Sequence, residues 1–100
     1  MDRNEVAKSL EHLAEQPEWN AGVWQQCYDL VSANMNDELL AYVHDDIIHY
    51  SGVFHSLNIL GFRVKPDRHQ LEDYRQEFRD IAAALRSGLS LGEAEKKYGL

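Results

Sequence analysis

The chain has 100 residues, of which 44% are hydrophobic and 27% are charged, and its formal net charge at pH 7 is −7. A chain of this length suits one domain, 1–100, and it is too apolar to be intrinsically disordered. The negative charge makes nucleic acid and anionic membranes unfavourable partners.

The sequence also bears on the compartment in which the protein works. The first twenty residues carry charges throughout and lack the apolar stretch of a signal peptide. No apolar run reaches the roughly 18 residues that a membrane-spanning helix needs. The lone cysteine, Cys27, cannot form an internal disulfide, which fits a reducing compartment. We therefore expect a cytoplasmic protein.

Two helices are predicted before residue 34. Asp2 and Glu5 have the spacing of a helix-capping pair, and an apolar stripe of helical period follows at Val6, Leu10, Leu13 and Ala14. Pro17 is expected to end this helix and to suit the first turn of the next one. The second helix, about 18–33, carries a broad apolar face that consists of Trp19, Val23, Trp24, Cys27, Leu30 and Val31.

The middle of the chain predicts two shorter helices. The third helix begins near Asn36 or Asp37, and its apolar stripe consists of Leu39, Leu40, Val43 and Ile47. Another face of this helix carries Glu38, Tyr42, Asp45 and His49. A short helix is then expected before Gly61, and the alternating residues 62–65 are expected to be extended.

The last third of the chain predicts one long helix and one short helix. Over 67–87, a clean stripe of period 3.6 consists of Leu71, Tyr74, Phe78, Ile81, Ala82 and Leu85. Ser90 and Glu93 then have the spacing of a capping box. Short links between helices favour an all-α fold, a small antiparallel bundle of about five to six helices with a short extended segment near 62–65.

Charge is distributed unevenly along the chain. Residues 9–62, here called the acidic block, contain no lysine and no arginine, and their eight carboxylates are Glu11, Glu15, Glu18, Asp29, Asp37, Glu38, Asp45 and Asp46. A surface with this charge steers association toward basic partners. The block therefore predicts what the protein can bind rather than a chemical activity.

Three aromatic residues of the acidic block, Trp19, Trp24 and Tyr28, allow two interpretations. Indoles and phenols are common anchors of protein interfaces, because each supplies a large contact area and one polar group. The alternative is that they are core residues of a small bundle. A mixed arrangement, with one tryptophan inside and one at an interface, is a third possibility.

The segment from His44 to His49 holds the densest group of potential metal ligands. Asp45 and His49 are four residues apart on a helix, so they could meet at one ion, whereas His44 and His49 diverge. A third ligand would have to come from His12 or His55. We interpret this segment as a solvated helix face and predict no metal and no cofactor, with Asp45 and His49 as weak candidates.

These observations favour a small acidic protein-binding module, such as an inhibitor, an immunity-like or antitoxin-like protein, or an adaptor. Its partner would be another protein with a basic surface, and no catalytic residue is predicted. The candidate partner-binding residues are Trp19, Trp24, Tyr28, Asp37, Glu38, Tyr42, Asp45, Asp46 and His49. The alternatives are a homodimeric structural or regulatory subunit, and a metal-dependent enzyme that uses the His44–His49 region.

Overall fold

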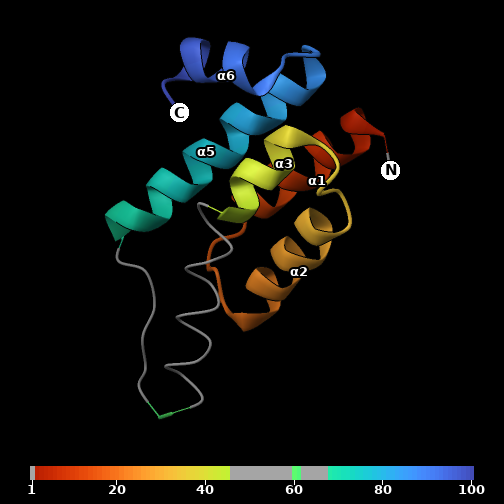
Figure 1. Ribbon diagram of the computed structural model, residues 1–100. Helices are drawn as coiled ribbons and strands as arrows, with labels where there is room; N and C mark the ends of the chain where they lie inside the picture. Colours follow the sequence, from red (N-terminus) through yellow and green to blue (C-terminus); the bar gives the residue numbers. More distant parts are fainter. Residues whose placement is uncertain (1, 46–59, 62–67) are drawn as a thin grey trace.

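The computed structural model describes residues 2–45, 60–61 and 68–100. Within these residues the chain is helical and has no strand, as the sequence predicts (Figure 1). The helices are α1 (Arg3–Ala14), α2 (Ala21–Ser32), α3 (Glu38–Val43), α5 (Arg68–Arg86) and α6 (Leu91–Tyr98). The extended segment expected at 62–65 and nearly all of the helix expected before Gly61 lie outside the described residues.

Four of these helices begin at a polar residue whose side-chain oxygen accepts a hydrogen bond from a backbone N–H of the first turn. The four capping residues are Asp2, Asn20, Asp37 and Ser90. Such caps satisfy N–H groups that have no partner inside the helix. The capping box of Ser90 and Glu93 is confirmed in both directions, and Gly99 ends α6 with a positive φ of 70°.

The start of the second helix corrects the sequence prediction. Asn20, and not Pro17, precedes the helix, so Trp19 lies in the linker between α1 and α2 rather than on a helical face. The indole N–H of Trp19 donates to the carbonyl of Leu13, 3.0 Å away, in the last turn of α1. The chain therefore crosses from α1 to α2 with a buried tryptophan that satisfies a carbonyl at the end of α1.

The core forms where α1 lies along α5, with α2 and α3 beside them (Figure 1). The predicted stripe of α5 is confirmed, because Phe78, Ile81, Ala82 and Leu85 are buried. Leu71 and Tyr74 are half-buried and pack against the same core. The predicted stripe of α3 is confirmed for Leu39, Leu40 and Val43, which are also buried, while Ile47 lies outside the described residues.

Two arginines hold the ends of α1 against α5. Arg3, at the start of α1, donates from Nη2 to the carbonyl of Leu89 at 3.0 Å, beyond the end of α5. Arg75, in the first half of α5, donates to the carbonyls of Gln16 and Pro17, which follow α1. The beginning of α1 therefore lies near the end of α5, and its end lies near the beginning of α5.

The terminal helix α6 packs at one end of the molecule, next to the last turns of α5 (Figure 1). Ala94 is buried against the core, and Leu91 and Tyr98 are partly buried beside it. Among the described residues, no helix combines the length and the apolar character that crossing a membrane requires.

Candidate functional site

The fold divides the described carboxylates of the acidic block into two groups. In the first group, each carboxylate binds another part of the same chain. Glu11 pairs with Arg86 of α5 at 3.0 Å, and Asp37 pairs with Arg3 at 2.9 Å. Both arginines come from outside the acidic block, so the charge separation seen along the sequence is partly neutralised by folding.

Glu38 also belongs to this first group. Its Oε1 accepts a hydrogen bond from the backbone N–H of Leu91 at 2.7 Å, at the start of α6. Asp37 has a second role as well, because its Oδ1 accepts from the N–H of Leu39 and caps α3. Both predicted partner-binding residues are therefore occupied in contacts that join α1, α3 and α6.

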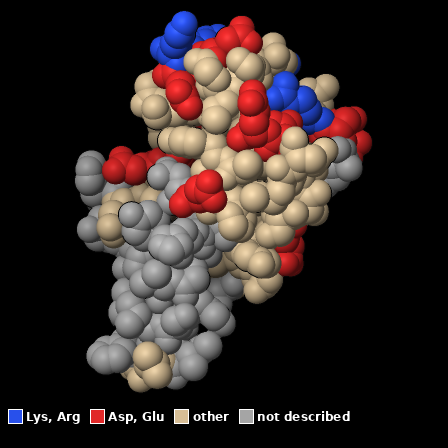
Figure 2. Space-filling view, in the orientation of Figure 1, with Lys and Arg blue, Asp and Glu red and all other residues tan. Residues whose placement is uncertain are grey.

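The second group of carboxylates is exposed and forms no ion pair with a lysine or arginine among the described residues. Its members are Glu15, Glu18, Asp29 and Asp45. Figure 2 shows where cations gather on one face of the molecule: the blue atoms lie toward the end that carries α6, while red atoms extend further down. The unpaired group is the part of the acidic block that can attract a basic partner.

The aromatic candidates separate in the same way. Trp19 and Trp24 are 6% and 9% exposed, and their rings meet edge to face at 4.9 Å. Trp19 also contacts Phe78, with ring centroids 5.0 Å apart. This burial favours the core interpretation for both tryptophans. Tyr28, one turn after Trp24, is 48% exposed instead.

Tyr28 is the centre of a small exposed surface between α2 and α3. Its ring lies 6.4 Å from the ring of His44, and His44 Nδ1 lies 3.6 Å from a carboxylate oxygen of Asp45. The side chain of Asp45 is 86% exposed. The next residue on α2, Asp29, accepts a hydrogen bond from Gln25 at 2.9 Å. We call the surface formed by Tyr28, Asp29, His44 and Asp45 the Tyr28 face.

The other predicted site residues differ in their placement. Tyr42 is half-buried and packs against the core, while Asp46 and His49 lie outside the described residues. In the described part of the chain, no three His, Cys, Asp or Glu side chains come close enough to hold a metal ion. His49, which could share an ion with Asp45, is one of the residues that the structure does not describe, so this possibility stays untested.

Cys27 is buried in α2, as its place on the apolar stripe predicts. Burial raises the pKa of its thiol from 9.0 to about 12, because the thiolate would lose its hydration. A buried cysteine of this kind behaves as a small apolar residue, and the main cause of its protection is desolvation. Cys27 is therefore a thiol and not a thiolate at neutral pH.

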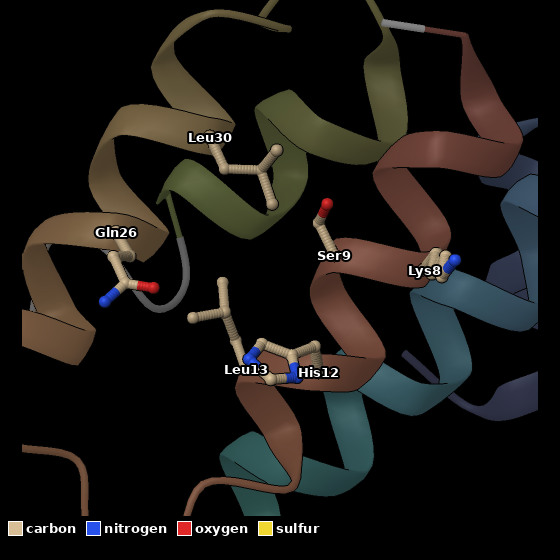
Figure 3. A pocket seen from close by; sticks show the side chains of 6 residues that line it. All are labelled: Lys8, Ser9, His12, Leu13, Gln26 and Leu30. Atoms are coloured by element: carbon tan, nitrogen blue, oxygen red, sulfur yellow. The ribbon is translucent and has the colours of Figure 1, made fainter.

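A groove between α1 and α2 was not identified from the sequence. Its volume is about 520 Å³, and its walls carry Lys8, Ser9, His12, Leu13, Gln26 and Leu30 (Figure 3). The sequence pattern that could have indicated the groove consists of two short spacings. Ser9 and His12 lie on one side of α1, and Gln26 and Leu30 lie on one side of α2. Only the packing of the two helices brings these faces together.

Comparison with known proteins gives no relative: no family model, no curated protein and no solved structure matches the chain significantly.

Proposed function

We propose that this chain is a small protein-binding module that docks onto a basic protein through the Tyr28 face. The observation that carries the proposal is the 48% exposure of Tyr28, between carboxylates that pair with no lysine or arginine among the described residues. An inhibitor, an immunity-like or antitoxin-like protein and an adaptor all act in this way. The Tyr28 face would act by occupancy, without chemistry of its own.

The chemistry of the face suits a basic partner for two reasons. A phenol supplies a large, rigid apolar area and one polar group, which is why tyrosine is enriched among residues that dominate binding energy. Exposed carboxylates such as Asp29 and Asp45 attract a positive surface and raise the association rate. The phenol would thus set how long the complex lasts, and the carboxylates how fast it forms.

The homodimer alternative receives less support. It rests on wide apolar faces of the second helix and of residues 53–62. Trp24, Cys27 and Val31 of α2 are buried within the chain's own core, while residues 53–59 and 62 lie outside the described residues. Two copies meeting through the Tyr28 face would also bring carboxylates together, and like charges at an interface are unfavourable. The metal-dependent enzyme alternative depends on His49, which lies outside the described residues.

We further propose that residues 1–100 form one antiparallel helical bundle that works in the cytoplasm. Support for the bundle comes from the contacts of Arg3 and Arg75, which join opposite ends of α1 and α5. The compartment rests on the sequence alone, through its lone cysteine.

Affinity capture with matched variants tests the binding proposal. Wild-type protein, a Tyr28→Ala, Asp45→Asn double variant and a Met35→Ala control are immobilised equally and exposed to an extract of the source cell. Met35 is a suitable control because it is 39% exposed but belongs to the link before α3. We expect a basic protein to be retained by the wild type and the control and lost from the double variant.

Binding kinetics with the retained protein then separate the two roles. Asp45→Asn should slow association, and this difference should shrink as salt screens the charges. Tyr28→Ala should instead accelerate dissociation at any salt concentration. Equal retention by all three proteins would contradict the proposal, as would a retained partner with an acidic contact surface.

A further inference from the structure

We propose that the groove between α1 and α2 binds a small organic carboxylate with a short apolar body. This site is separate from the Tyr28 face and does not depend on the function proposed above. Its six wall residues come from two helices, four from α1 and two from α2 (Figure 3). A volume of about 520 Å³ falls within the range of roughly 300–1,000 Å³ that is typical of small-molecule sites.

The apolar part of the site comes from two leucines. Leu13 is buried at the base of the groove on α1, and Leu30 is half-buried on α2. In Figure 3 both side chains point into the space between the two helices. An alkyl or aryl group placed between them would remove apolar surface from water on both sides, which is favourable.

The polar part of the site has an unusual charge for this molecule. None of the six wall residues is acidic, although the chain carries a net charge of −7. Lys8 lines the groove from α1, and among the described residues its ammonium pairs with no carboxylate, whereas Arg3, Arg75 and Arg86 all do. The groove therefore offers an uncommitted cation beside an apolar surface.

Neutral donors complete the match to a carboxylate. The Gln16 amide lies 3.3 Å from His12 Nε2, and a hydrogen bond donated there leaves the ring proton on Nδ1 of His12. Ser9 and Gln26 add a hydroxyl and an amide to the walls. The net negative charge of the protein repels anions at long range, but physiological salt limits that repulsion to about 8 Å. The charges closest to the groove therefore determine whether an anion is attracted to it.

The experiment uses the full chain and three probes: hexanoate, octanoate and 3-phenylpropanoate. Each is titrated at physiological salt into isotopically labelled protein while backbone amide shifts are followed, with octylammonium and octanol as comparison ligands. We expect saturable shifts centred on Ser9, His12 and Gln26 with at least one carboxylate. Octanol should bind more weakly than octanoate, and octylammonium should bind most weakly.

Matched lysine variants test the role of charge. Lys8→Met should weaken carboxylate binding by about two- to fivefold, the effect of losing one exposed ion pair. Lys96→Met, which removes an exposed lysine from α6, a helix that contributes no residue to the groove, should leave binding unchanged. Both variants replace exposed side chains, and equal melting temperatures would verify that the fold is intact.

Several results would overturn the inference. These are an absence of saturable shifts with all three carboxylates, shifts centred outside the groove, and octylammonium binding as tightly as octanoate. Equal affinities of Lys8→Met and Lys96→Met would also reject it. None of these results bears on partner capture by the Tyr28 face, so the two proposals fail separately.

Discussion

Two aromatic regions, adjacent in the sequence, have opposite relations to solvent. Trp19 and Trp24 are buried beside Phe78, whereas Tyr28 is half exposed beside His44. The change occurs within one helical turn, because Cys27 is fully buried and its neighbour Tyr28 is not. The buried cluster holds the fold together, and the exposed phenol is available for another molecule.

The carboxylates repeat this division. Asp37 caps α3 and pairs with Arg3, so its charge is used inside the molecule, whereas Asp45 is 86% exposed. A block of like charge in a sequence is therefore not one functional surface. Two comparisons test this division: a buried with an exposed aromatic residue, and a paired with an unpaired carboxylate. In each comparison, substitution of the buried or paired residue should lower the free energy of unfolding, and substitution of the exposed one should not.

The largest expected effect concerns Cys27. Because burial raises its pKa from 9.0 to about 12, the thiolate fraction at pH 8 is about a thousandfold lower than in an unperturbed thiol. Iodoacetamide should therefore modify Cys27 far more slowly in native protein than in urea, as measured by mass spectrometry over time. Comparable rates in the two conditions would place Cys27 at the surface.

Phe78→Ala should produce the largest loss of stability. Phe78 is fully buried and contacts Trp19, and truncating a buried phenylalanine costs about 3–5 kcal/mol. Tyr28→Ala should change the free energy of unfolding by only about 0.5 kcal/mol, as surface substitutions do. Urea denaturation measures both variants, and similar losses would remove the distinction between the cluster and the face.

The paired carboxylates should give an intermediate effect. Asp37→Ala removes a helix cap and the ion-pair partner of Arg3, and cap removal alone costs about 0.5–2 kcal/mol. Asp45→Ala should stay within about 0.5 kcal/mol of the wild type. Urea denaturation at neutral pH compares the two, and a larger loss for Asp45→Ala would reverse the assignment of the two carboxylates.

The smallest effect is expected at Glu93. The backbone N–H of Ser90 donates to its carboxylate and lowers its pKa below 4.5. The native state therefore binds this proton less readily than the unfolded state, so the stabilisation is present above about pH 4.5 and disappears as the pH falls through the native pKa. Thermal melts from pH 6 to pH 3 should show a smaller acid-induced loss in Glu93→Gln than in the wild type.

A matched variant controls for the removal of charge at this helix. Glu95→Gln also neutralises an exposed carboxylate on α6, but it leaves the capping box in place. Its stability should follow the wild-type dependence on pH. If Glu93→Gln and Glu95→Gln behaved alike, the capping box would not contribute to the stability of α6.

The sequence predicts the helices because their signals are local. Ser90 with Glu93 and the stripe that contains Phe78 and Ile81 each depend on residues within a few turns. The sequence predicts too early a start for α2, because Pro17 is typical of a first helical turn. In the structure Asn20 provides the cap, and Trp19 is drawn into the core before the helix begins.

The candidate site was harder to predict, because it depends on contacts between distant residues. Nothing near Asp37 in the sequence indicates that Arg3 neutralises it, and nothing near Glu38 indicates its bond to Leu91. A helical pattern also cannot tell which aromatic residue of a broad face is covered. Tyr28 was among the candidates, but only the packing of the chain separates it from Trp24.

Partner capture by Tyr28→Ala, Asp45→Asn protein tests the central claim most directly, provided that its circular dichroism spectrum matches that of the wild type. Our account predicts a folded protein that no longer retains the basic partner held by wild-type protein and by Met35→Ala. Undiminished capture by the folded double variant would contradict it, because the Tyr28 face would then be an exposed surface without a role in binding.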